Sequence, residues 1–115
     1  MRKFVLITAL SLIAALPSFA QQQQGTASYY SGQSGHRVTK SGEPVNPNSN
    51  AAASPNLPMG SQATVTNRKT GKSADVRIND RGPTRNNRVI DLSKKPAHDL
   101  GMEKSGTAPV NVQPK

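Results

Sequence analysis

Cysteine and tryptophan are absent from this sequence of 115 residues, and aromatic side chains make up only 3% of it. Without cysteine, neither a disulfide bond nor lipid attachment through an N-terminal cysteine can supplement the hydrophobic core. Both phenylalanines lie within the first twenty residues, which leaves two tyrosines for the rest of the chain. So thin a core at this chain length favours a small closed β structure with long surface loops.

Histidine is also scarce, and this narrows the chemistry that the chain can perform. His36 and His98 are the only two, and neither has an acidic residue at a metal-ligand spacing, so a zinc site is not supported. There is no Gly-x-Ser-x-Gly elbow and no glycine motif of the phosphate-binding type. We therefore predict no metal and no cofactor, and carboxylate chemistry remains.

The first twenty residues have the pattern of a secretory signal peptide. Arg2-Lys3 precedes an apolar run from Phe4 to Leu16, and Ser18-Phe19-Ala20 is a small-x-small cleavage site. The run is too short for an ordinary bilayer span. We expect cleavage after Ala20, with an uncleaved anchor as the alternative. The product is expected to be periplasmic or secreted, with no lipid anchor and no stable membrane insertion.

Acidic residues are few, and the chain is strongly basic. Removing 20 of the 115 residues leaves 95, in which thirteen basic side chains oppose six acidic ones, a net charge of +7. An exported protein is not expected to meet nucleic acid. Long-range attraction to an anionic polymer, such as cell-wall glycan with its peptide carboxylates, fits this charge. Solubility alone is the alternative explanation.

The residues after the signal predict one mostly β domain. Residues 21–24 form a polar glutamine tract that we expect to be disordered, and the domain covers residues 25–115. Its strand segments are β-prone, alternating or apolar in composition. These predicted strands cover residues 25–30, 61–67, 73–79, 88–92 and 106–112.

One helix and one long loop complete this outline. The helix is predicted over residues 94–100, with Ser93 as its N-cap and Gly101 as its stop. Residues 33–56 are rich in glycine, serine, asparagine and proline, which predicts a loop. Within that loop, Ala51 to Ala53 can form a helical turn that ends before the next proline.

The segment from Arg77 to Pro83 is the most distinctive part of the chain. Asp80 follows an alternating strand pattern, and a turn at a strand end would hold its carboxyl rigidly. A turn-capping aspartate is the alternative interpretation, and spacing alone favours it. For Asp91, which also follows a β-branched strand, a capping or ion-pair role is the stronger interpretation. Hydrolytic glycosidases use two carboxyl groups, whereas a lytic enzyme needs only one.

A series of short motifs runs in order along the chain after the signal. They are Gly25 to Tyr30, Thr39 to Glu43, Leu57 to Gly60, Val65 to Asn67, Val76 to Pro83, Arg88 to Ser93, Leu100 to Met102 and Val110 to Val112. Together these motifs resemble the rare lipoprotein A family. The resemblance covers about the whole chain after the signal, and the shared order of the motifs makes it strong.

This resemblance implies a six-stranded double-psi β-barrel, related to barwin and expansin domains, with one short helix near the C-terminus. It also implies an exported endolytic peptidoglycan transglycosylase. In such enzymes an aspartic acid protonates the glycosidic oxygen between N-acetylmuramic acid and N-acetylglucosamine. The same group then deprotonates the C6 hydroxyl of the N-acetylmuramic acid, which leaves a 1,6-anhydro end on that sugar. The resemblance implies Asp80 as the acid and base, and the expected substrate contacts are Tyr30, Ser54, Asn79, Arg81 and Asp91.

Ser54 marks a departure from the family pattern, because relatives usually have a histidine at this position. A serine hydroxyl can form hydrogen bonds but does not titrate near neutrality. A non-catalytic glycan-binding barrel is therefore one alternative. A barwin-like or expansin-like effector that acts on another polysaccharide is a second. We expect a monomer whose partner is a peptidoglycan strand.

Overall fold

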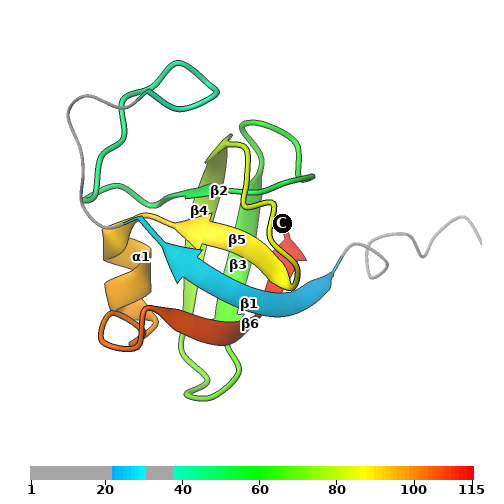
Figure 1. Cartoon of the computed structure of the whole chain (residues 1–115), viewed down its shortest axis with the longest axis vertical. Coiled ribbons are helices and arrows are strands. Elements are labelled where there is room, and N and C mark those ends of the chain that lie inside the picture. Colours follow the sequence, from blue (N-terminus) through cyan, green and yellow to red (C-terminus); the bar gives the residue numbers. More distant parts are fainter. Residues whose placement is uncertain (1–21, 31–37) are drawn as a thin grey trace, which may run out of the picture.

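Six strands and one helix make up the part of the chain that the structure describes. The computed structural model describes residues 22–30 and 38–115, so the predicted signal peptide and His36 lie outside the described residues. The elements are β1 (Gln23–Tyr29), β2 (Ala51–Ala53), β3 (Gln62–Asn67), β4 (Ser73–Asp80), β5 (Arg88–Leu92), α1 (Lys94–Asp99) and β6 (Thr107–Pro114) (Figure 1). Within the described ranges, no helix has the length and apolar character needed to cross a membrane.

The strands close into a barrel in the order β1-β5-β2-β4-β3-β6. The pairs β1 with β5 and β2 with β4 are parallel, and the other neighbouring pairs are antiparallel. Closure leaves no unpaired edge along the sheet. Two parallel pairs, each joining strands that are distant in the chain, are the arrangement of a double-psi β-barrel. The predicted fold class, mostly β with one short helix, is confirmed.

Aliphatic side chains from alternate strand positions fill the barrel. The fully buried set from β3 to β6 includes Val65, Val76, Ile78, Ile90, Leu92, Val110 and Val112. Leu100 and Met102, which follow α1, join the same cluster. Because side chains alternate between the two faces of a strand, the residues between these positions lie toward the outer surface. The polar residues of the candidate site come from this outer set and from the strand ends.

Strand β2 corrects one prediction. The helical turn predicted for Ala51 to Ala53 is wrong, because these residues form a strand that pairs in parallel with β4 and antiparallel with β5. All three alanines are buried. Alanine favours helix locally, but such propensity is a weak prior that pairing with two strands overrides. The expected loop therefore supplies one of the six strands.

The start of β1 corrects another prediction. Residues 21–24 were expected to be disordered, yet Gln23 and Gln24 are paired with Val112 and Asn111 of β6. Both partners lie at the end of the strand predicted over residues 106–112, and β6 continues for two residues beyond that end. The glutamine side chains bury little apolar surface, so composition gave no sign of this pairing.

Gly25 lies in β1 where a neighbouring turn approaches closely. A Cβ at this position would lie 2.5 Å from Cγ1 of Val89 and 2.8 Å from the backbone oxygen of Asn87. That oxygen accepts the N–H of Thr26 at 2.7 Å, so it is held in place. We predict that Gly25→Ala lowers the free energy of unfolding by about 1 to 3 kcal/mol through overpacking. Urea unfolding measures the change, with exposed Gln24→Ala as the control, and equal midpoints for the two variants would contradict the prediction.

Candidate functional site

Two carboxyl groups lie in one row across the barrel. Asp80 is the last residue of β4 and Asp91 lies in β5, and Ala53 of β2 is in register with both. On the far side of Asp91, Ser28 of β1 is its register partner. Neighbouring strands are about 4.8 Å apart, so about 10 Å separates the two backbones that carry the carboxyl groups. Each carboxyl therefore makes contacts of its own.

Asp80 is half-buried and is held through one of its oxygens. Oδ1 accepts the backbone N–H of Lys40 at 2.9 Å and the backbone N–H of Arg81 at 2.9 Å. Among residues 22–30 and 38–115, no hydrogen bond to Oδ2 and no ion pair to Asp80 is formed. One of the two carboxyl oxygens is thus fixed by backbone donors.

Asp91 is half-buried and is held by a hydroxyl group. Oγ of Ser28 donates a hydrogen bond to Oδ1 of Asp91, across the parallel pair of β1 and β5. Within the described part of the chain, Asp91 forms no ion pair. It also lies three residues before the first residue of α1 and does not belong to its first turn. Among the described residues, these contacts are neither an ion pair nor a helix cap, which were the expected roles of Asp91. Asp91 therefore stays in the candidate site.

The guanidinium of Arg81 binds the turn that follows β2 and, among the described residues, forms no ion pair with Asp80. Its Nη1 donates to the backbone oxygens of Ser54 at 3.0 Å and Leu57 at 2.6 Å. The hydroxyl of Ser54 accepts the N–H of Leu57 at 2.9 Å and that of Asn56 at 3.2 Å, and Ser54 is only 1% exposed. These contacts fasten the 54–57 turn to the end of β4. The Ser54 hydroxyl serves this turn, and we assign no substrate contact to it.

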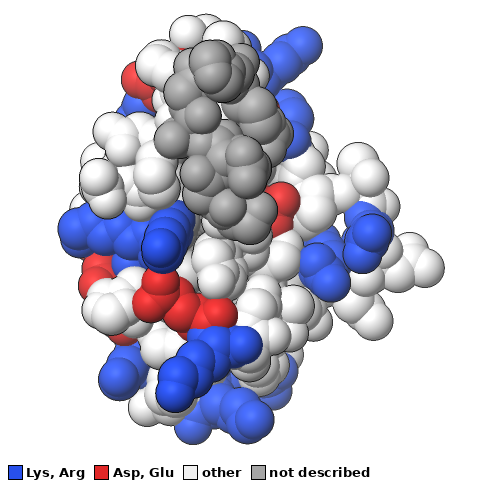
Figure 2. All heavy atoms as spheres, turned by 60° about the vertical axis from the view of Figure 1, so that its left-hand side comes forward, with Lys and Arg blue, Asp and Glu red and all other residues white. Residues whose placement is uncertain are grey.

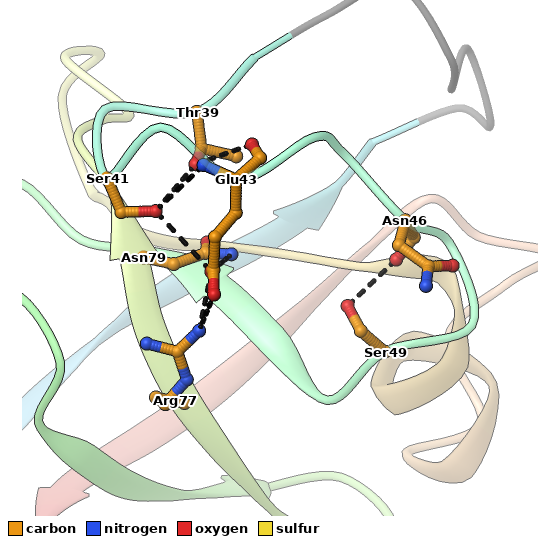
Figure 3. A network of polar contacts seen from close by, with 7 residues as sticks. All are labelled: Thr39, Ser41, Glu43, Asn46, Ser49, Arg77 and Asn79. Atoms are coloured by element: carbon orange, nitrogen blue, oxygen red, sulfur yellow. Dashed lines mark hydrogen bonds and ion pairs between the residues drawn. The ribbon is translucent and has the colours of Figure 1, made fainter.

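A second polar cluster lies beside Asp80 and is formed by Glu43, Arg77 and Asn79 (Figure 3). Nη2 of Arg77 donates to Oε2 of Glu43 at 2.6 Å, and Nδ2 of Asn79 donates to Oε1 of Glu43 at 2.9 Å. Asn79 is only 6% exposed, and its Nδ2 holds the loop through Glu43. Sequence reasoning missed Glu43 and Arg77. Alternation in β4 places Arg77 outside, but its partner lies 34 residues away in a loop without periodicity.

The two tyrosines at the end of β1 are used differently. Tyr29 packs against the core cluster, and its hydroxyl donates to the backbone oxygen of Glu103 at 2.9 Å. Tyr30 is half-buried, and its N–H donates to the backbone oxygen of Leu92 at 2.9 Å, which continues the pairing with β5. Of the predicted substrate contacts, Tyr30 and Asp91 lie on neighbouring strands in the site region. Ser54, Asn79 and Arg81 hold the segments around it.

Positive charge is only partly neutralised over the described surface. Four ion pairs form there: Arg77 with Glu43, Lys95 with Asp99, His98 with Glu103 and Lys115 with Asp75. Figure 2 shows lysines and arginines at several places on the face that carries α1, with acidic residues between them. In residues 22–30 and 38–115, no group of three or more histidine, aspartate or glutamate side chains could hold a metal ion.

The fold and this row of polar residues define a double-psi barrel with an aspartate at the end of β4. The chain belongs to the lytic transglycolase family, whose sequence pattern matches residues 22–112. The resemblance to the rare lipoprotein A family is thereby confirmed.

Three relatives show how close this similarity is. The endolytic peptidoglycan transglycosylase RlpA of Neisseria meningitidis serogroup A is 47% identical over 91 residues, which cover 79% of this chain and 38% of that protein. RlpA of Pseudomonas aeruginosa is 44% identical over 94 residues, covering 82% of this chain and 28% of that protein. A probable RlpA from Nostoc is 49% identical over 92 residues, covering 78% and 25%. The chain thus spans 38% or less of the length of these relatives.

Solved structures support the fold. An expansin from Clavibacter michiganensis superposes with a TM-score of 0.64 at 22% identity, covering 82% of this chain and 50% of the expansin. The Streptomyces papain inhibitor also reaches a TM-score of 0.64, at 20% identity, covering 81% of this chain and 93% of the inhibitor. At such identities the likeness concerns the barrel alone.

The contacts of Glu43 predict a pH-dependent contribution to stability. Hydrogen bonds from the Asn79 amide and the Arg77 guanidinium lower the pKa of Glu43 below its ordinary value of 4.5. Because the folded-state pKa is the lower one, the contribution is fully present above pH 4.5 and is lost as the pH falls through the folded-state pKa. Glu43→Gln should therefore unfold at lower urea concentration than the unmodified protein at pH 7. At about pH 3 the difference should shrink, and an equal deficit at both pH values would contradict this account.

Proposed function

We propose that this chain is the catalytic domain of an exported endolytic peptidoglycan transglycosylase in which Asp80 is both the acid and the base. The observation that carries the proposal is the state of Asp80 at the end of β4. Its Oδ1 is fixed by two backbone N–H groups, and Oδ2 has no hydrogen-bond partner among the described residues. Family membership and relatives named as endolytic peptidoglycan transglycosylases support this function.

The proposed reaction begins with Asp80 as a carboxylic acid. Its proton passes to the glycosidic oxygen as the bond between that oxygen and C1 of N-acetylmuramic acid breaks. The carboxylate then takes the proton of the C6 hydroxyl, and the C6 oxygen bonds to C1. The products are a 1,6-anhydro end and a free 4-hydroxyl on N-acetylglucosamine. Asp80 recovers its proton, and no water is consumed.

The backbone donors around Asp80 suit this sequence of steps. Once Asp80 has given up its proton, the N–H groups of Lys40 and Arg81 stabilise the negative charge on Oδ1. Both donors are already in place, so little reorganisation is required. General acid and base catalysis of this kind contributes about 100-fold to 10,000-fold to a rate.

Two further side chains are the proposed substrate contacts. Asp91 is oriented by the Ser28 hydroxyl and lies in the same row as Asp80, and Tyr30 extends β1 beside β5. We place the glycan across this row. Asp91 would accept hydrogen bonds from sugar hydroxyl groups, and Tyr30 would pack against a sugar ring. Uncompensated lysines and arginines would attract the peptide carboxylates of the wall polymer over longer distances. The site of action would be the periplasm or the medium, and a monomer suffices.

A non-catalytic glycan-binding barrel is the second candidate function. The observation that favours it is Ser54, where the family resemblance implies a histidine, and whose hydroxyl accepts hydrogen bonds from two backbone N–H groups. That position therefore offers no second titratable group beside Asp80. The likeness to expansin concerns the fold alone and adds no support for action on another polysaccharide.

Digestion of purified sacculi tests the enzymatic proposal. The protein should release muropeptides with 1,6-anhydro ends, detected by mass spectrometry, and Asp80→Asn should lower that rate by at least about 100-fold. Asp75→Asn is the matched control, because Asp75 is an exposed carboxylate on the same strand that pairs with Lys115. It should leave the rate unchanged.

The same preparations separate the two candidate functions. If the unmodified protein releases no anhydro ends while an active lytic enzyme does so in parallel, the enzymatic proposal is wrong. Sedimentation with sacculi that persists in Asp80→Asn would then support the binding module. Hydrolysed reducing ends in place of anhydro ends would exclude the lytic mechanism.

A further inference from the structure

The N–H group of Lys40 reaches Asp80 from a turn that is not part of the barrel. This turn, residues 39–44, is closed by the N–H of Thr39 donating to the backbone oxygen of Glu43 at 2.8 Å and by the N–H of Gly42 donating to that of Thr39 at 2.9 Å. The Thr39 hydroxyl also donates to the Glu43 backbone oxygen at 2.9 Å. Lys40 therefore sits near the tip of a well-bonded turn, and the direction of its N–H depends on how the whole turn is placed.

Strand β4 places that turn through side chains that precede Asp80. Arg77 donates from Nη2 to both carboxylate oxygens of Glu43, and Asn79 donates to Oε1 (Figure 3). The N–H of Ser41 donates to the backbone oxygen of Asn79 at 3.1 Å. Since Arg77, Asn79 and Asp80 belong to one strand, the anchor of the turn and the carboxyl that it approaches share one rigid frame.

We propose that Arg77 is a positioning residue for Asp80, which acts by holding Glu43 and thereby aiming the Lys40 N–H at Oδ1. The role in catalysis rests on the proposed function of Asp80, but the positioning does not. Arg77 itself touches neither Asp80 nor the position assigned to the glycan. Its contact with Glu43 suits this task, because Nη2 bridges both carboxylate oxygens and such charge-assisted hydrogen bonds are stronger than neutral ones.

An ordinary surface ion pair is the competing interpretation, and the same strand provides its matched control. Asp75 pairs with Lys115, and the two side chains are 56% and 46% exposed. Glu43 and Arg77 are similarly exposed, at 47% and 42%. Exposed pairs of this kind contribute little to stability. The two pairs differ in what they hold. Glu43 belongs to the turn whose Lys40 N–H donates to Asp80, whereas neither Asp75 nor Lys115 belongs to that turn.

Nuclear magnetic resonance of the purified protein tests the positioning without requiring activity. The amide proton of Lys40 should shift with pH as Asp80 titrates, and the part of the shift that disappears in Asp80→Asn belongs to that carboxyl. In Arg77→Ala this part should fall by more than half, and Arg77→Lys should restore some of it. Lys115→Ala should leave it unchanged. A full Asp80-dependent shift in Arg77→Ala would overturn the proposal, as would an equal loss in Lys115→Ala.

Kinetics on soluble glycan strands supply the second measurement. If Arg77 positions Asp80, Arg77→Ala should lower kcat about 10-fold, the size expected for weakening one hydrogen bond to a charged group, with KM little changed. Glu43→Gln should behave in the same way, and Lys115→Ala should match the unmodified protein. A rise in KM at constant kcat would overturn the positioning role. Inactivity of the unmodified protein would count against the proposed function alone, because the amide titration still decides the role of Arg77.

Discussion

Hydrogen bonding of β2 to both β4 and β5 is the constraint on which the candidate site depends. Ala53 is in register with Asp80 on one side and Asp91 on the other, so strand spacing sets the separation of the two carboxyl groups. The three residues of β2 are alanines, and all are buried. Because alanine has no side-chain rotamers, β2 adds no side-chain conformational freedom between the two carboxyl groups. The strand also leads directly into the turn at residues 54–57, which packs back onto the end of β4.

The polar residues around Asp80 divide into the proposed substrate contacts and those that hold the surrounding turns in place. Arg81 and Ser54 fasten one turn, and Asn79 and Glu43 fasten another. What these side chains deliver to Asp80 is a pair of backbone N–H groups at a fixed position. Backbone donors suit this purpose because they carry no rotamer freedom and remain donors at every pH. Among the described residues, the second carboxyl oxygen accepts no hydrogen bond, as the proposed mechanism with a single acid and base requires.

The resemblance to the rare lipoprotein A family implies a histidine where this chain has Ser54, so the proposed chemistry rests on one group. The hydroxyl of Ser54 accepts two backbone N–H groups in a buried turn, so this position contributes order and not proton transfer. In the proposed mechanism Asp80 must then act alone, with its charge stabilised only by neighbouring N–H groups. Positive charge over the rest of the surface acts at longer range, on the concentration of an anionic polymer near the barrel. These two contributions are physically separate. The N–H groups at Asp80 would affect the rate at which the glycosidic bond breaks, whereas the surface charge would affect the rate at which protein and polymer meet.

By itself, the sequence determined the elements whose signal is local. Period-two alternation in β4, the short apolar run of β5, the short helix after Ser93, and the ordered motifs that include Asp80 could all be recognised from neighbouring residues. Only the tertiary structure decided that Ala51 to Ala53 form a strand, that Gln23 pairs with β6, and that Arg77 reaches Glu43. Each of these contacts joins segments more than twenty residues apart. The sequence pattern of one segment does not indicate which distant segment it will contact. Their energy comes from hydrogen bonds and charge pairing that exist only once the barrel has closed.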